Sequence, residues 1–304
     1  MIKEIDVTNY LGEHLLLDFS SMINNDLILS QADGLGPGAS TINTIAYAST
    51  DGSKFSSARI DQRNIVLYFV YNYYSKKTIE EIRYESYKYF PLKKYVKLRI
   101  KTDNREATIE GYVESNEATI FSEATGCQVS IICPDPYFYS VKDVTADLFS
   151  VVPLFAFPFD DEISASPSIE FSKYSTVPQA TLLYEGDSDI GIVCNIWLEG
   201  RVQGITLYDT KKNTSVSINT DTLESILGSN LQRGDKITIS TVTGNKNVTL
   251  ARDGVTYNAL HAIDAVNQKW LKLTTGVNSF AITATEGITN LHGTITAKNI
   301  YGGM

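Results

Sequence analysis

The stretch VSIICPDPYFYS, residues 129–140, decides how this chain divides. Its first half predicts a buried β-strand, because Val129, Ile131 and Cys133 alternate along the chain and share one face of an extended backbone. Pro134 follows at once, and proline has no N–H to donate to a neighbouring strand. The strand therefore ends abruptly, and we interpret it as the last element of a first domain.

The residues that follow this strand predict a stiff joint between two domains. Asp135 lies between two prolines, and a residue that precedes proline is held in the extended region. Such a joint keeps two domains at a fixed angle, where a Gly/Ser linker lets them drift. The three aromatic residues 137–139 can then pack between the domains. The candidate joint comprises Cys133, Pro134, Asp135, Pro136, Tyr137 and Phe138.

Length and composition agree with two β-rich domains. A chain of 304 residues is long enough for two cores, and we assign residues 1–136 and 137–304 to them. The hydrophobic fraction of 43% and the charged fraction of 20% are typical of a globular protein. With 18 Tyr and 12 Phe against 3 Met, the composition favours strands over helices.

Most of the first domain is predicted to be strand. Residues 64–74 are aromatic and β-branched, which is typical of a long strand. Residues 95–101 and 107–115 flank the turn residues Asp103 and Asn104 and predict a hairpin.

A single amphipathic helix interrupts these strands, from Thr78 to Phe90. Thr78 can accept a hydrogen bond in the first turn and Glu81 can reach back, which is the pattern of a capping box. Apolar residues around Ile82 recur at helical spacing, and Pro91 ends the helix. We expect this helix to lie against a sheet.

A glycine-rich loop, ADGLGPGAS at residues 32–40, has only a superficial likeness to a phosphate-binding loop. Pro37 removes an amide, and the residues after it look extended where a phosphate loop needs a helix. Asp51 and Gly52 form a second turn pair. We therefore interpret this region as a flexible hairpin or arm.

The second half of the chain shows short strands separated by turns, and no convincing helix. Examples are GIVCNIWLEG at 191–200, RGDKITISTV at 233–242 and NSFAITATEG at 278–287. Strands at intervals of 8 to 12 residues predict a β-sandwich.

The net charge of −9 argues against a nucleic-acid partner bound through a basic patch. In the one cationic run, residues 91–101, Lys97, Arg99 and Lys101 alternate with apolar residues and predict a solvated strand face. The acidic N-terminus does not resemble a signal peptide, and no apolar run is long enough to span a bilayer. We expect a protein made and kept in a cytoplasm, or assembled there into something larger.

The residues give no catalytic constellation and no metal spacing. Cys127 and Cys133 lie about 20 Å apart on one face of one strand, too far to pair if that strand is continuous. The segment GDSDIG at 186–191 favours a plain turn, because it lacks the length and the terminal Glu of a calcium loop. Trp197 and Trp270 can stack on a sugar, but a tryptophan in such a strand is more often part of a core.

The order of these segments resembles the distal tail protein (Dit) family of long-tailed phages and phage-tail-like particles. In the first domain the resemblance rests on DQRNIVLYFVYNYY, on TIEEIRYESYKYF and on the terminator VSIICPDPYF. In the second it rests on RGDKITISTVTGNKNVTLARDG, on WLKLTTGVNSFAITATEG and on the closing YGG at 301–303. Each piece is short, and the signal lies in their order and spacing over most of the chain.

The resemblance implies a mainly β protein with a structural role in a virion. Its N-terminal β-sandwich or split-barrel domain, with one helix, would form a six-fold ring. Its C-terminal domain would be a galectin-like, or carbohydrate-binding-module-like, β-sandwich. The homo-hexamer would join the tail tube protein to the tail-associated hub protein and can carry receptor-binding proteins, with DNA passing through the lumen without specific binding. The resemblance implies no enzyme activity, no cofactor, no metal and no membrane.

A ring of this kind needs strands or arms that contact a neighbouring subunit. The aromatic strand 64–74 and the arm at 32–56 are the candidates that the sequence offers. The candidate ring contacts are Gly34, Gly36, Gly38, Asp51, Gly52 and Phe55.

Two other functions remain open at this point. The second domain could grip a host cell-wall polysaccharide, with Trp197 and Trp270 as the glycan contacts. A β-rich glycoside hydrolase is the weaker alternative, since 35 acidic residues make a pair of carboxylates uninformative.

Overall fold

The computed structural model describes residues 1–20, 25–120, 125–148, 151–153, 172–174, 178–264 and 269–304. The chain divides into two compact units. The first comprises Met1–Val141 together with Ile300–Met304, and the second comprises Lys142–Asn299. The division falls five residues after the predicted boundary at residue 136, and the last five residues return to the first unit.

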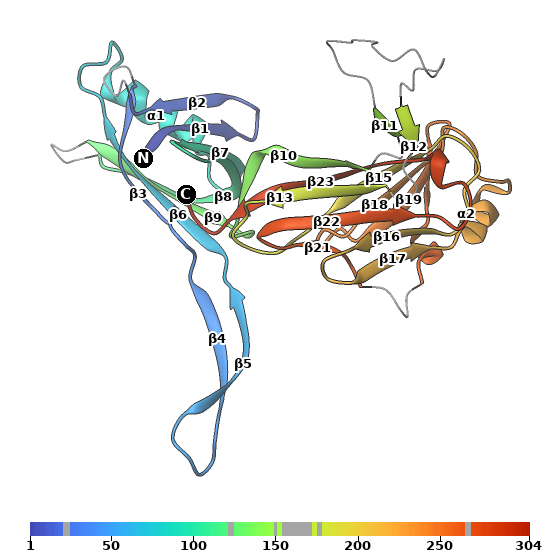
Figure 1. Ribbon diagram of the computed structural model, residues 1–304. Coiled ribbons are helices and arrows are strands. Elements are labelled where there is room, and N and C mark those ends of the chain that lie inside the picture. The colour runs from blue at the N-terminus through green and yellow to red at the C-terminus, as the bar shows by residue number, and fades with distance from the viewer. Residues whose placement is uncertain (21–24, 121–124, 149–150, 154–171, 175–177, 265–268) are drawn as a thin grey trace, which may run out of the picture. The chain divides into compact units, whose positions relative to one another are not determined.

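The first unit is an antiparallel sheet that curls around its core (Figure 1). The strand order is β2–β1–β7–β8–β9–β6–β3. Leu17 in the edge strand β2 and Leu27 in the opposite edge strand β3 join the same buried cluster, so the two edges approach one another. The bounds are β1 (Ile2–Asn9), β2 (His14–Asp18), β3 (Leu27–Asp33), β6 (Arg63–Tyr71), β7 (Tyr95–Thr102), β8 (Glu106–Ala118) and β9 (Gly126–Cys133).

Alternation of side chains decides which face each of these strands buries. In β7, Val96, Leu98 and Ile100 are buried, and the strand pairs with β8 in the predicted hairpin. In β9, Val129 and Cys133 are fully buried, and the strand lies between β6 and β8. The predicted strand is therefore confirmed, although β10 (Phe138–Leu148) also begins within the first unit.

Helix α1 (Ile79–Tyr89) begins at the predicted capping box. The N–H of Glu81 donates to Oγ1 of Thr78 at 3.3 Å, and the N–H of Thr78 donates to Oε2 of Glu81 at 2.7 Å. Ile82 and the C-cap residue Phe90 are buried, and the helix contacts β1, β6, β8 and β9. The prediction that this helix lies against a sheet is confirmed.

The second unit is a β-sandwich of two antiparallel sheets (Figure 1). One sheet has the order β23–β15–β18–β19–β20 and the other β13–β22–β16–β17. Cys194 and Ile196 of the first sheet and Leu207 and Phe280 of the second are fully buried. The bounds are β13 (Gln179–Tyr184), β15 (Val193–Leu198), β16 (Ile205–Asp209), β17 (Thr214–Ile218), β18 (Lys236–Ser240), β19 (Asn247–Arg252), β20 (Val255–Asn258), β22 (Gly276–Thr283) and β23 (Leu291–Tyr301).

The expectation of no helix in the second half is wrong, because α2 occupies Thr220–Leu227. Oδ1 of Asn219 accepts hydrogen bonds from the N–H groups of Asp221 and Thr222, and Gly228 ends the helix with φ of 67°. Asparagine before a helix and glycine after it are boundary signals. The helix between them is only eight residues long, too short to show a clear helical period.

The remaining elements are short. Strand β11 pairs with β12, and β14 pairs with β21. Their bounds are β11 (Val151–Pro153), β12 (Ser172–Tyr174), β14 (Ile190–Gly191) and β21 (Lys272–Leu273), with 3₁₀ turns at Leu260–Ala262 and Ile288–Asn290. Within the described ranges, no helix has the length and apolar character needed to cross a membrane.

All three cysteines are buried and free, and Cys127 and Cys133 lie on one continuous strand. Burial raises the pKa of Cys194 to about 12 and also raises the pKa of Cys127. These thiols therefore stay protonated at neutral pH and act as small apolar side chains.

Candidate assembly surface

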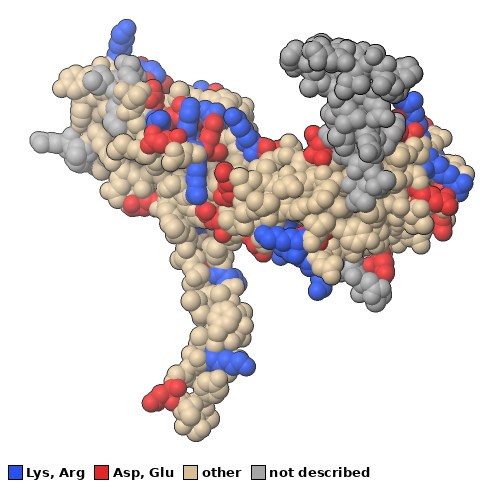
Figure 2. All heavy atoms as spheres, in the orientation of Figure 1, with Lys and Arg blue, Asp and Glu red and all other residues tan. Residues whose placement is uncertain are grey.

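The arm is a two-stranded hairpin that extends from the rest of the first unit (Figure 1). Strand β4 (Ser40–Ala46) pairs with β5 (Ser53–Ile60), and among the described residues neither pairs with another strand. Every residue from 36 to 60 is exposed except Thr41, which is half-buried. Figure 2 shows few charged atoms along it. The charged residues of this range are Asp51, Lys54 and Arg59.

A β-bulge places most of the apolar side chains of this hairpin on one face. Cross-strand partners share a face, and the register pairs Ile42 with Ala58. The register then shifts by one residue, so that Ser56 is left over and Phe55 pairs with Thr44 on the face that carries Ile42. Without this bulge, simple alternation would place Phe55 on the opposite face.

The two faces of the arm differ in chemistry. The apolar face carries Ile42, Phe55 and Ile60, which are 61%, 62% and 40% exposed. On the other face Asn43 donates a side-chain hydrogen bond to Ser57 at 3.0 Å, and the isoleucine Ile45 lies there among polar residues and Lys54. An apolar stripe that is exposed on one face of a hairpin is typical of a contact surface.

The base of the arm is packed where the glycine-rich loop meets the core. Leu35 is 7% exposed and belongs to the buried cluster of the first unit. Gly34 has a φ of +82°, and a Cβ atom there would lie 2.0 Å from the carbonyl oxygen of Asn64. Only glycine fits that position. The loop is therefore fixed at its base, while the hairpin beyond it is exposed.

Arg63, the first residue of β6, binds three segments at this base. Its side chain is buried, with only 5% of the residue exposed. Nε donates to the carbonyl of Pro136 at 2.7 Å, and Nη1 donates to those of Gly34, at 2.6 Å, and Gly36. Nη2 donates to the carbonyl of Gly302 at 2.6 Å. A buried guanidinium needs such acceptors, so these carbonyls hold the loop, the joint and the C-terminal segment together.

Arg63 also sets the electrostatics of its surroundings. Its Cζ lies 4.7 Å from the ring centroid of Phe138, a cation–π contact. Burial lowers the pKa of Arg63. Burial also raises the pKa of the Cys133 thiol to about 11, although the positive charge of Arg63 opposes the shift. Cys133 is therefore a buried thiol and not a nucleophile.

The C-terminal residues close the same base. The N–H of Met304 donates to the carbonyl of Leu35 at 2.9 Å. Arg105 donates to the carbonyl of Gly303 at 3.2 Å, and its Cζ lies 4.3 Å from the ring centroid of Tyr301. A Cβ atom on Gly303 would lie 2.9 Å from the backbone of the glycine-rich loop. Gly303 of the closing YGG therefore lies where its backbone approaches another backbone closely.

The predicted joint packs within the first unit. Phe138 is fully buried in the core of that unit, so for this residue the expectation of packing between domains is wrong. Asp135 accepts from the N–H of Tyr137 at 3.1 Å and from the hydroxyl of Tyr139 at 2.6 Å. Strand β10 (Phe138–Leu148) starts here and pairs with β8.

The structure separates the predicted ring contacts into two groups. The carbonyls of Gly34 and Gly36 are engaged by Arg63 of the same chain, so these residues anchor the arm. Sequence reasoning missed Arg63, although an arginine that opens an apolar strand must find acceptors if it is buried. The other predicted contacts, Gly38, Asp51, Gly52 and Phe55, are exposed and lie beyond this base.

The cationic face of β7, predicted to be a solvated strand face, forms ion pairs with neighbouring strands. Arg99 pairs with Glu4 at 2.7 Å and with Glu106 at 3.1 Å. Lys97 pairs with Glu110 at 3.3 Å. This face is therefore a solvated network of alternating charge and offers no basic patch.

The two tryptophans of the second unit are not core residues, so that interpretation is wrong. Trp197 is 38% exposed on β15, and Nζ of Lys236 lies 5.1 Å from its ring centroid. Trp270 is half-buried, with Nζ of Lys246 at 5.7 Å. The lysine side chain over each indole ring occupies a ring face on which a sugar would otherwise stack.

The segment 186–191 contains a bend, and two of its carbonyls accept hydrogen bonds from side chains. Thr275 donates to the carbonyl of Gly186 at 2.6 Å, and Tyr184 donates to that of Ser188 at 2.7 Å. Across the part of the chain that the structure describes, no group of three or more His, Cys, Asp or Glu side chains is placed to hold a metal ion.

Comparison with known protein structures identifies the fold. No family model matches the sequence, and no curated protein matches it either. The crystal structure of the Dit protein of phage SPP1, described as a paradigm of the hub adsorption apparatus in phages that infect Gram-positive bacteria, superposes with a TM-score of 0.63. The match has 10% sequence identity and covers 97% of this chain and 98% of that one.

Two structures of the phage p2 baseplate in its activated conformation, with strontium and with calcium, give TM-scores of 0.47 and 0.46. Both are 14% identical in sequence, and they cover 97% and 98% of this chain and the same shares of theirs. The match to SPP1 Dit carries the assignment: the chain has a Dit-like fold, and the predicted fold class is confirmed.

Proposed function

We propose, from its Dit-like fold, that this chain is a structural component of a phage tail tip that assembles as a six-fold ring. The ring joins the tail tube protein to the tail-associated hub protein, and DNA passes through its lumen without specific binding. It can also carry receptor-binding proteins. The protein acts in the virion, is assembled in the bacterial cytoplasm, and is not an enzyme.

The observation that carries this proposal is the one-sided arm. Its apolar face is exposed, although the first unit already has a complete core that buries Leu35 at the base of the arm. An isolated two-stranded hairpin without a core of its own is only marginally stable, because ordering its backbone costs conformational entropy. The face bearing Ile42 and Phe55 therefore needs a neighbouring surface to pack against. In a ring of heterologous contacts that surface belongs to the next subunit.

The energy available is sufficient for a specific contact. Burying one exposed Ile or Phe side chain contributes about 1.5–3 kcal/mol. Ile42 and Phe55 together would then contribute about 3–6 kcal/mol at each contact, which corresponds to about 100-fold or more in its dissociation constant. A closed ring repeats this contact at every subunit boundary.

The arm supplies a matched pair of variants for the test. Ile42 lies on the apolar face and Ile45 on the opposite face, and they are 61% and 60% exposed. We expect the purified protein to show a hexameric mass, or a multiple of it, by native mass spectrometry. Ile42→Ser should shift this mass toward the monomer, and Ile45→Ser should not. A strictly monomeric wild-type mass at high concentration, also with hub protein present, contradicts the proposal.

A further inference from the structure

The chain contains three Asp-Gly pairs, at residues 33–34, 51–52 and 253–254. In such a pair the backbone nitrogen of the glycine can attack the aspartate side chain before it, because glycine has no Cβ atom to obstruct the approach. The attack needs a backbone that can rotate to bring the two atoms together, and a carboxyl group that is not held elsewhere. The fold treats the three pairs differently in both respects.

The pair Asp33-Gly34 is held at the base of the arm. Asp33 ends β3 and pairs with Val66 of β6. The carbonyl of Gly34 accepts a hydrogen bond from Arg63 at 2.6 Å. Nε2 of Gln31 donates to Oδ1 of Asp33 at 2.9 Å. Both the backbone and the carboxylate of this pair are therefore restrained.

The pair Asp253-Gly254 forms the two-residue turn between β19 and β20. The flanking residues Arg252 and Val255 are cross-strand partners. The φ angle is 50° at Asp253 and 80° at Gly254, and positive values at both central residues are typical of a type I′ turn. Because the paired strands fix the dihedral angles of this turn, it resists the rotation that the attack requires.

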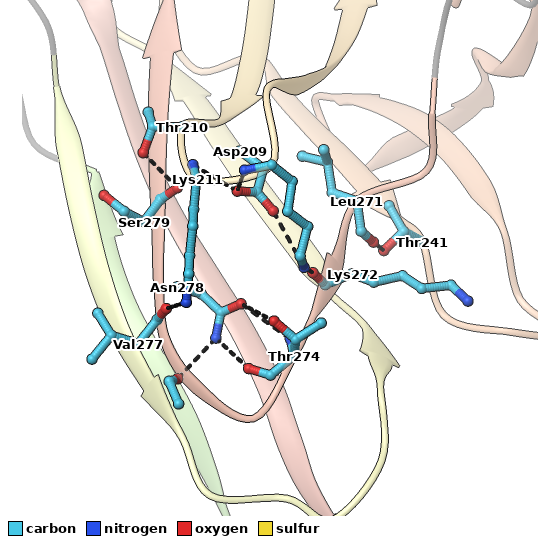
Figure 3. Close-up of polar contacts among 12 residues, drawn as sticks. Asp209, Thr210, Lys211, Thr241, Leu271, Lys272, Thr274, Val277, Asn278 and Ser279 are labelled. Carbon is cyan, nitrogen blue, oxygen red and sulfur yellow. Dashed lines mark hydrogen bonds and ion pairs between the residues drawn. The ribbon is translucent and has the colours of Figure 1, made fainter.

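Asp209 shows how completely the fold can block this attack (Figure 3). Its carboxylate is buried and accepts hydrogen bonds from the N–H groups of Lys211 and Lys212 at 3.0 Å each. The backbone nitrogen that follows it, in Thr210, donates to the carbonyl of Ser279 at 2.9 Å. Both groups that would have to react are therefore engaged in other bonds.

The pair Asp51-Gly52 is the least restrained of the three. It lies in the loop of residues 47–52 at the far end of the arm, beyond the last cross-strand pair, Ala46 with Ser53 (Figure 1). Both residues are exposed, and a Cβ atom on Gly52 would meet nothing within 4 Å. Among the described residues, no hydrogen bond or ion pair holds the carboxylate of Asp51.

We propose that the fold selects Asp51, among the three pairs, for spontaneous isomerisation to isoaspartate. The nitrogen of Gly52 bonds to Cγ of the protonated Asp51 side chain. One carboxyl oxygen leaves as water, with the hydrogen of the amide and the hydrogen of the carboxyl group. The cyclic succinimide that results then takes up water. Breaking its bond between nitrogen and Cγ restores aspartate, whereas breaking its bond between nitrogen and the backbone carbonyl carbon gives isoaspartate.

The water released in the first step is regained in the second, so the mass is unchanged and no oxidant or cofactor is needed. Isoaspartate routes the backbone through the Cβ atom of residue 51, which lengthens the loop by one backbone atom and leaves a carboxylate directly on Cα. The tip of the arm is thereby marked as the subunit ages. The reaction does not require ring formation. A ring that covers the loop would slow it, and this last consequence rests on the proposed function.

The test incubates the full-length wild-type chain and the Ile42→Ser variant at neutral pH. Peptide mapping with electron-transfer fragmentation then distinguishes isoaspartate from aspartate. In at least one of the two chains, isoaspartate should accumulate at residue 51 about tenfold faster or more than at residues 33 and 253. In urea, where the fold is lost, the three rates should converge.

Two variants of residue 51 check the chemistry. Asp51→Glu keeps the charge but closes a larger ring far more slowly, so it should suppress the signal. Asp51→Asn should form the same succinimide with loss of ammonia, and the peptide should gain the mass of an amide-to-acid conversion.

The contrary results are equal rates at the three pairs in the folded chain, or no isoaspartate at residue 51 in either chain. Rates that stay apart in urea also overturn the proposal, because local sequence and not the fold would then select the site. Isoaspartate in Ile42→Ser but not in the wild-type chain supports the proposal and shows that assembly covers the loop. Isoaspartate in a wild-type chain of strictly monomeric mass supports the isomerisation and contradicts the proposed ring.

Discussion

The guanidinium of Arg63 donates to the backbone carbonyl of Gly302 at 2.6 Å, across 239 positions of sequence. The same side chain binds Gly34 and Gly36 at the base of the arm and Pro136 in the joint. The residue that holds the base of the proposed contact arm thus also binds the C-terminal segment.

Replacing Arg63 should destabilise the first unit selectively. Arg63→Met leaves four buried or partly buried carbonyls without their charged donor, and we expect a loss of about 3 kcal/mol or more. Far-UV circular dichroism in urea should show an earlier transition. Fluorescence should not, because both tryptophans lie in the second unit. The control Arg59→Met removes an exposed ion pair and should cost under about 1 kcal/mol. Equal losses in the two variants would mean that the carbonyl contacts add nothing.

A fragment of residues 1–136 should be less stable than the structure's own first unit. It lacks Phe138 and Tyr301, both of which belong to the core cluster. We expect residues 1–141 joined by a Gly/Ser linker to 300–304 to unfold cooperatively at a higher urea concentration than 1–136. The Tyr301→Ala variant of the joined fragment should lose much of this increase in the urea midpoint. Equal midpoints for 1–136 and the joined fragment would show that the C-terminal segment packs without stabilising.

Removing the arm should give a folded monomer. Residues 41–59 can be replaced by Asn-Gly, because Ser40 and Ile60 are already paired across the hairpin. Leu35 and Gly36 stay, since they belong to the base that Arg63 holds. We expect an unchanged melting transition together with a monomeric native mass. Rings that still form without the arm would place the subunit contact elsewhere on the first unit.

The buried face of α1 should tolerate no charge. Ile82 is fully buried, so Ile82→Asp places a carboxylate among apolar side chains without a partner and should prevent the first unit from folding. Tyr84→Asp introduces the same residue at a position that is 55% exposed, and it should fold normally. Size-exclusion chromatography and circular dichroism separate the two outcomes. A folded, merely monomeric Ile82→Asp protein would place this helix face at the subunit contact.

Acid stability near α1 should depend on Lys77. Burial by itself raises the pKa of Asp26, but hydrogen bonds from Lys77 at 2.8 Å and Ser75 at 2.6 Å outweigh it and hold this pKa below its ordinary value. The contribution to stability is therefore present above the ordinary Asp pKa of about 3.9 and is lost as pH falls through the lower folded value.

Lys77→Met should consequently raise the pKa of Asp26 and move the start of acid unfolding to higher pH. Carboxylate titration followed by NMR measures the first effect, and pH-dependent circular dichroism measures the second. Lys76→Met, at the neighbouring exposed position, should change neither. If the pKa of Asp26 is unchanged in Lys77→Met, the hydrogen bond from Ser75 alone lowers it.

The sequence by itself determined the local elements of this protein. The strand at Val129 to Cys133, the hairpin around Asp103 and the capping box at Thr78 follow from period-two alternation, turn residues and a cap three residues from its partner. Each of these signals lies within about ten residues, where backbone sterics and local hydrogen bonds decide the outcome. Helix α2 was not predicted, because its eight residues have cap residues at both ends but are too few to show a helical period of apolar residues.

Only the tertiary structure decided what depends on distant neighbours. The bulge at Ser56, which moves Phe55 onto the apolar face of the arm, depends on which residue of β4 faces which residue of β5. The exposure of Trp197 depends on which face of β15 the opposite sheet covers. Arg63 finds its acceptors at positions 34, 36, 136 and 302. Backbone carbonyls are present at every residue, so no side-chain pattern could reveal them as partners until the fold brought them to one buried charge.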